Sequence, residues 1–187
     1  MLKTLLVYAH LLASCLALGR VLHADHQLWS WRTRQLATAQ LEYLAETRRL
    51  VGLALGALWL SGLLLVLQGY LSEGPAYLLN QKLWAKVAVV VLLSLNGLVL
   101  HRVGFPRLLQ APFVALPFSS RSGLAMLGAL STSGWLFAAF LGVARQWNHA
   151  LSCLQVMMVF ATLLGLACLL GLTMAIAAGA QGRRAAC

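Results

Sequence analysis

Long apolar runs separated by short polar stretches make up most of this chain. Each of five runs is about as long as the 20 residues that a helix needs to cross a bilayer. They cover residues 2–22, 50–71, 83–103, 124–144 and 150–178. A helix satisfies its own backbone hydrogen bonds in lipid. The pattern therefore predicts an all-α, polytopic transmembrane helix bundle, with residues 1–187 as a single transmembrane domain.

Two of the connections between the runs are informative. Residues 23–49 contain neither Gly nor Pro and are rich in good helix formers, so they are predicted to lead as a helix directly into the second span. Such a helix would project from the membrane, as a solvated or interfacial connector or as a partner-docking element. Residues 105–120 carry three prolines and are too interrupted to cross, so we expect them at the interface.

Composition agrees with membrane burial, since 61% of the 187 residues are hydrophobic and only 10% are charged. The formal charge of +10 would suggest nucleic acid in a soluble protein. Here the basic residues are spread between apolar runs, which is the positive-inside pattern, and no nucleic-acid partner is expected.

Ten of the 14 basic residues share one side of a five-span topology. They are expected to face the cytoplasm, which places the amino terminus outside and the carboxyl terminus inside. The ten are Arg20, Arg32, Arg34, Arg48, Arg49, Arg102, Arg107, Arg121, Arg183 and Arg184.

The four cysteines, Cys15, Cys153, Cys168 and Cys187, show no CxxC spacing, so neither a zinc site nor a disulfide framework is predicted. Residues 12–15 (LASC) resemble a lipoprotein cleavage site, but lipidation there would place the arginines of residues 32–49 on the outer side. We therefore expect the first run to remain a span.

Small residues are spaced for close helix packing in two spans. Gly52 and Gly56 have GxxxG spacing in the second span, and Gly134, Ala138 and Gly142 repeat at the same interval in the fourth. Such faces let another helix approach closely. A membrane protein partner or a homo-oligomer is one interpretation.

Histidines in or beside the spans are candidate ligands, and a rise of about 1.5 Å per residue converts sequence position into depth. His10 and His101 differ in depth by roughly 12 to 15 Å, too far for both to bind one haem iron. His101 lies instead at the level of His23 and His26, with Asp25 between them. These groups could ligate a metal or an axial haem position. The alternative is that they are interfacial histidines in contact with water and lipid headgroups.

A second candidate metal set lies toward the other side of the membrane. His149, Cys153 and Met157 are spaced i, i+4, i+8, which would place them on one face of the fifth helix, and His10 falls near the depth of Met157. Imidazole, thiolate and thioether ligands together suit Cu(I). The alternative is a Met/Cys stripe in the core with a histidine at its interfacial end.

Two polar residues of the third span are predicted to have different roles. Lys86 lies near the outer boundary, where it can pair with Glu73 or a lipid phosphate, or hold an anionic group such as a haem propionate. Asn96 lies deeper and is expected to bond to another helix. No soluble-type catalytic motif is present, and the acidic residues fall outside or at the edge of the spans, so a proton relay is not expected.

Three short motifs are similar to a known family. His10 in the first span, residues 45–50 (AETRRL) before the second, and residues 84–86 (WAK) opening a third span that ends in His101 resemble the small bacterial inner-membrane proteins of the CopD and HemJ type. The resemblance covers roughly residues 5–103. It implies a four- or five-helix bundle that handles copper in the CopD-like case, or that binds haem b and oxidises protoporphyrinogen in the HemJ-like case. By position, His10 would match the first-span histidine and Lys86 the third-span lysine of the HemJ-like pattern.

The leading prediction is a multi-pass protein of the bacterial inner membrane that binds a haem b or copper ion within its bundle and could be redox-active. His10 is the first candidate ligand, because an unpaired imidazole well inside an apolar span is unfavourable. Lys86 and His101 are further cofactor-binding candidates. The alternatives are a non-enzymatic anchor or assembly subunit of a larger complex, and a small-solute transporter. The sequence leaves open whether the protein is an enzyme.

Overall fold

A computed structural model describes the backbone of residues 1–186 and the side chains of residues 1–182. Cys187 and the side chains of Arg183 and Arg184 lie outside this part. Five long helices are long and apolar enough to cross a membrane, and no strand occurs in the described backbone. They are α1 (Leu2–Ser30), α2 (Thr38–Glu73), α3 (Gln81–Val99), α5 (Phe118–Val143) and α6 (Cys153–Ala186). The predicted all-α bundle of a multi-pass membrane protein is therefore confirmed.

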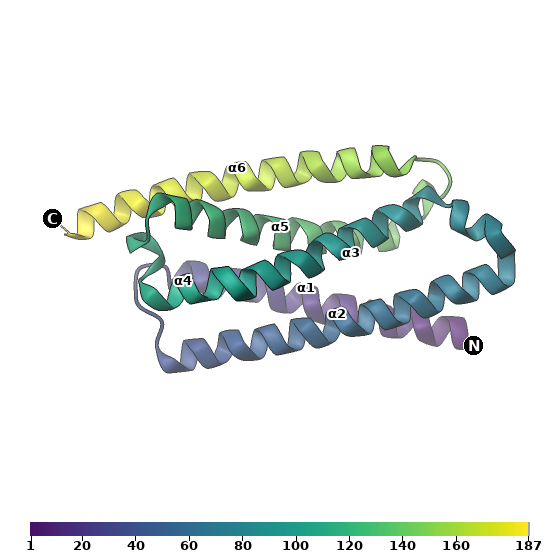
Figure 1. The fold of residues 1–187 in the computed structure, drawn as a ribbon, viewed down its shortest axis with the longest axis horizontal. Coiled ribbons are helices and arrows are strands. Elements are labelled where there is room, and N and C mark those ends of the chain that lie inside the picture. Colours follow the sequence, from purple (N-terminus) through teal and green to yellow (C-terminus); the bar gives the residue numbers. More distant parts are fainter. Residues whose placement is uncertain (187) are drawn as a thin grey trace.

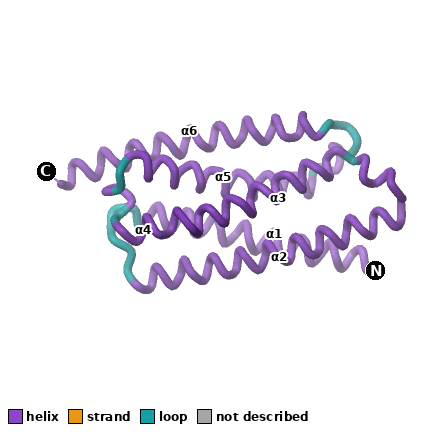
Figure 2. The backbone as a smooth tube through the Cα atoms, viewed as in Figure 1, coloured by secondary structure: helices purple, strands orange, loops and turns teal. Residues whose placement is uncertain are grey.

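The helices lie side by side in an elongated bundle, with the amino and carboxyl termini at opposite ends (Figure 1). The turns between helices gather at these two ends (Figure 2). We call these two ends the N-terminal end and the C-terminal end of the bundle. Helix α1 packs against α2, α5 packs against α6, and α3 packs mainly on α5 and α6. Contacts between α1 and α5 join the two halves.

Small, branched and aromatic apolar side chains from five helices make up the buried core. Ala17 of α1, Ala85 and Val89 of α3, Leu141 of α5 and Val156 of α6 are almost completely buried. Most of the large apolar side chains that are exposed are leucines, as expected for surfaces that meet lipid tails. The narrow core therefore leaves the outer faces of all five helices for the bilayer.

The connection over residues 23–49 differs from its prediction as one helix leading into the second span. Helix α1 continues to Ser30, the chain turns, and α2 begins at Thr38. The start of α2 packs back on α1: the Arg20 guanidinium lies 4.5 Å from the Tyr43 ring centre and 3.3 Å from a carboxylate oxygen of Glu46. These contacts between helices, rather than helix propensity, decide where the turn falls.

The region after α3 forms a compact turn at the C-terminal end of the bundle. A π-helical segment (Leu100–Gly104) passes into α4 (Phe105–Gln110), and a 3-10 turn (Phe113–Ala115) precedes α5. Pro106 lies in the first turn of α4 and has no N–H for a helical hydrogen bond, which favours a local widening of the helix before it.

Arg121, in the first turn of α5, holds this connection in place. It is 8% exposed, and its Nη1 donates hydrogen bonds to the carbonyl oxygens of Val114 and Leu116, both at 2.9 Å. The backbone N–H of Val114 also donates to the carbonyl of Arg32 at 3.1 Å. The buried Arg121 side chain thus joins the 3-10 turn to α5. Through Val114, the 3-10 turn is bonded to the loop after α1.

The small-residue faces are used unequally. A Cβ at Gly134 would lie 2.8 Å from Leu93 Cδ2 of α3, so the lack of a side chain permits the close approach of α3 and α5. By contrast, a Cβ added at Gly52 or Gly56 would meet no atom of another segment within 4 Å, and both glycines are exposed. A partner for that face of α2 stays a prediction.

Candidate functional site

His10 lies half-buried between α1 and α2, with its imidazole held by Ser61. Its Nδ1 is 2.8 Å from Ser61 Oγ, and the Ser61 hydroxyl donates to the carbonyl oxygen of Ala57 at 2.6 Å. Since a hydroxyl has one proton to donate, Ser61 accepts the Nδ1 proton of His10. The lone pair of the neutral ring is then on Nε2. This is the arrangement in which a second partner orients an imidazole as a metal ligand.

Two lysines of α3 lie at the same end of the bundle as His10. Lys82 is 2% exposed, and its Nζ donates to the carbonyl oxygen of Ala144 at 2.6 Å. Lys86 follows one turn later on the same face and is half-buried. We call His10, Ser61, Lys82 and Lys86 the histidine site.

No acidic residue balances the histidine site in the described part of the chain. The single ion pair among residues 1–182 joins Arg20 to Glu46. The pairing of Lys86 with Glu73, one of the two predicted roles of that lysine, is therefore not formed. Two lysines at the same end of the bundle as an imidazole, without an ion-pair partner among the described residues, favour an anionic ligand that also carries a group for nitrogen to bind.

The predicted set of His23, His26, His101 and Asp25 is not assembled. Within residues 1–182, no three His, Cys, Asp or Glu side chains lie in positions to hold a metal ion. His23 and His26 are exposed, and Tyr43 Oη lies 2.5 Å from His23 Nδ1. Asp25 instead accepts a hydrogen bond from Thr132 of α5. Residues two apart on a helix point in different directions, so a shared depth does not bring Asp25 and His23 together.

The predicted stack of His149, Cys153 and Met157 on one helix face is wrong for its first member. His149 lies in an exposed turn with a φ of 58°, and α6 begins only at Cys153. The helix start is set by a capping box: the Ser152 N–H donates to Gln155 Oε1 at 2.9 Å, and the Gln155 N–H donates to Ser152 Oγ at 3.2 Å. Cys153 and Met157 remain one turn apart and pack against the core.

Cross-helix hydrogen bonds hold α3 in the middle of the bundle. The Asn96 side chain donates to the carbonyl oxygen of Leu127 on α5 at 3.1 Å, which confirms the predicted bond to another helix. On the opposite side, Trp59 Nε1 of α2 donates to Ser94 Oγ at 3.1 Å. These bonds fix the rotation of α3, which in turn sets the direction of Lys82 and Lys86.

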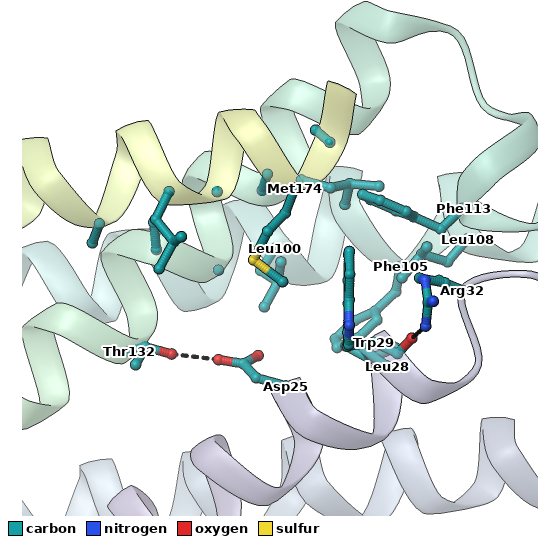
Figure 3. A pocket seen from close by; sticks show the side chains of 18 residues that line it. Asp25, Leu28, Trp29, Arg32, Leu100, Phe105, Leu108, Phe113, Thr132 and Met174 are labelled. Carbon is teal, nitrogen blue, oxygen red and sulfur yellow. Dashed lines mark hydrogen bonds between the residues drawn. The ribbon is translucent and has the colours of Figure 1, made fainter. Parts of the chain in front are cut away.

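A cavity of about 350 Å³ near the C-terminal end is a second candidate site that the sequence did not predict. We call it the aspartate cavity, because Asp25 is its one acidic residue (Figure 3). Asp25 lines this cavity and accepts a hydrogen bond from Thr132 of α5, so its carboxyl group faces the interior of the bundle. Small residues four apart in the fourth span, such as Ala125 and Ala129, were the available signal, since they leave room beside α5.

Comparisons of the chain with family models, with curated proteins and with solved structures found no match. The resemblance to CopD- and HemJ-like proteins therefore stays a prediction based on the motifs around His10 and Lys86. A function can therefore be inferred only from the chemistry of the histidine site and of the aspartate cavity.

Proposed function

We propose that this protein is an integral membrane protein that binds haem b at the histidine site, where the His10 imidazole would hold the iron. The observation that carries the proposal is the His10 imidazole held at Nδ1 by Ser61, at the same end of the bundle as Lys82 and Lys86. Haem b combines an iron that binds imidazole nitrogen with two anionic propionates. It therefore matches both the free Nε2 of His10 and the uncompensated lysines.

The lysines have distinct roles in this proposal. Lys86 is half-buried and donates no hydrogen bond to the described residues, so its ammonium group is available to a propionate. Lys82 already donates to the Ala144 carbonyl and adds positive charge from one turn away. Haem bound here would supply one-electron redox chemistry, and its potential would respond to these charges.

Copper fits the described residues less well. Cu(I) prefers several soft ligands, but His149 precedes α6, and no three His, Cys, Asp or Glu side chains of residues 1–182 form a cluster. Cys153 and Met157 alone supply only two sulfur atoms, both packed against apolar core residues. Haem requires a single protein nitrogen on one face, which His10 can provide.

Purification in detergent followed by a visible absorption spectrum and metal analysis tests the proposal. We expect a Soret band, either as isolated or after addition of haemin, and iron in proportion to bound haem. A colourless preparation that takes up no haem would exclude a haem protein. Copper in place of iron would likewise contradict it and favour the alternative cofactor.

We further propose that the membrane is the bacterial inner membrane and that the C-terminal end of the bundle faces the cytoplasm. The support is the excess of basic residues predicted on that side and the position of the termini at opposite ends (Figure 1). Green fluorescent protein fused after residue 187 is expected to fluoresce, because it folds poorly when exported unfolded through the Sec pathway. Fluorescence from a fusion before residue 1 instead would reverse the orientation.

A further inference from the structure

The aspartate cavity is separate from the histidine site. Asp25 follows His10 by 15 residues on α1, which corresponds to roughly 22 Å along the helix axis. The cavity lies among α1, the π-helical segment, α4, α5 and α6, and its volume of about 350 Å³ is in the range of small-molecule sites. Gly128, Ala129, Gly171 and Ala175 form part of its wall, and their short side chains account for the open space.

Asp25 places a carboxyl group in this apolar space. Its carboxylate accepts a hydrogen bond from the Thr132 hydroxyl through one oxygen, and the other oxygen receives none from the described residues. No basic side chain of residues 1–182 lies within ion-pair distance of it, since the single pair is Arg20 with Glu46. A carboxylate in such surroundings is unfavourable unless a cation compensates it.

The arginine at the cavity does not supply that compensation. Arg32 Nη1 donates to the Trp29 carbonyl oxygen at 2.9 Å, and Nε donates to Gln181 Oε1 at 3.3 Å. Its guanidinium lies 4.5 Å from the centre of the Trp29 ring. Figure 3 shows Arg32 beyond Trp29, on the side away from Asp25. The carboxylate and the guanidinium therefore mark two different parts of the cavity.

Aromatic side chains line part of the cavity. Trp29 is one turn after Asp25 on α1, and Phe105 and Phe113 line the cavity from α4 and the 3-10 turn. Met174 extends from α6 into the space between Asp25 and Trp29 of α1 (Figure 3). Aromatic faces attract organic cations, and a polarisable thioether packs well against apolar groups.

We propose that the aspartate cavity binds a small lipophilic organic cation, with its ammonium group against Asp25 and its apolar part against Trp29 and the small residues of α5 and α6. Charge complementarity identifies the ligand class for the part of the cavity at Asp25, because this carboxyl group has no cationic partner there, whereas the Arg32 guanidinium lies beyond Trp29. An anionic lipid or fatty acid is disfavoured, since it would place a second negative group beside Asp25.

Isothermal titration of the detergent-solubilised full-length protein with benzyltrimethylammonium tests this proposal. Neopentylbenzene, its uncharged carbon isostere, is the matched control ligand. We expect the cation to bind the wild-type protein and the neutral isostere to bind at least about tenfold more weakly, since it lacks the charge that Asp25 would pair with. Equal binding of the two ligands, or no binding of the cation, would overturn the proposal.

Three variants locate the binding. Asp25→Asn keeps an acceptor for Thr132 and is expected to weaken cation binding about tenfold or more. Glu42→Gln makes the same charge change at an exposed position of α2 and should leave binding unchanged. Gly128→Leu is expected to abolish binding of the cation. A Cβ at position 128 would meet no atom within 4 Å, so the added side chain fills the cavity and does not displace the backbone. Unaltered affinity in Asp25→Asn and Gly128→Leu would place the cation elsewhere.

The neutral ligand keeps the test decisive if Asp25→Asn does not fold, because the comparison of the two ligands needs only the wild-type protein. The result is also independent of haem. Cation binding in a colourless protein would support this proposal while contradicting the one for the histidine site.

Discussion

Replacement of His10 by alanine is expected to abolish the Soret absorbance of the purified protein. His10 is the histidine whose Nδ1 is held inside the bundle by a second helix, through the bond of 2.8 Å to Ser61, and whose Nε2 is free to bind iron. Without that nitrogen the propionate contacts of the lysines would have to hold the haem alone. The measurement is the absorption spectrum after haemin addition and removal of unbound haem, with bound haem quantified as its pyridine complex.

His26→Ala is the matched control for this variant, because His26 lies on the same helix and is exposed. It should keep the wild-type spectrum. Ser61→Ala removes the partner that orients the ring, and such changes around a metal ligand typically weaken binding by about 10- to 100-fold. Retention of full haem binding by His10→Ala, or its loss in His26→Ala, would assign the ligand to another residue.

Replacement of Arg121 by methionine is expected to lower the free energy of unfolding by about 3 kcal/mol or more. The variant loses two hydrogen bonds from a charged donor, to Val114 and Leu116, and each such bond contributes about 1.5 to 3 kcal/mol. Methionine keeps the length of the apolar stem, so the change isolates the guanidinium. Denaturant-induced unfolding in detergent, followed by circular dichroism, measures the effect.

Arg102→Met is the control for Arg121→Met. Arg102 is exposed at the same end of the bundle, and its side chain makes no hydrogen bond or ion pair with residues 1–182. Its replacement should change the unfolding free energy by no more than about 0.5 kcal/mol. Similar losses in both variants would mean that positive charge at this end, and not the buried contacts of Arg121, is what stabilises the protein.

The helix bundle follows from the sequence because the signal for a span is strong and local. About 20 consecutive apolar residues leave little choice of structure in lipid. The bond of Asn96 to another helix follows in the same way, since a deep amide has no water to bind. These predictions need only the identity of a residue and its distance from the end of a span.

Predictions are less accurate where they depend on the direction in which a side chain points or on the residue at which a helix begins or ends. The i, i+4, i+8 spacing alone places His149 on the fifth helix, whereas the capping box of Ser152 and Gln155, a recognisable start signal, begins the helix after it. The turn after Ser30 contains no helix breaker and depends on contacts of Arg20 with α2, which only the fold reveals. Counting depth says nothing of the rotation of α1, so it could not predict that Asp25 faces Thr132 of α5.

The order of the helices along the chain affects how α3, which packs on α5 and α6, can be inserted during synthesis. During synthesis α3 emerges from the ribosome before either of its main partners exists. The acceptors of its buried donors come later: Leu127 for Asn96, and Ala144 for Lys82. Helices α1 and α2 can pair as soon as both are made, whereas α3 must keep two polar side chains near water, lipid headgroups or the insertion machinery until the fourth span has been translated.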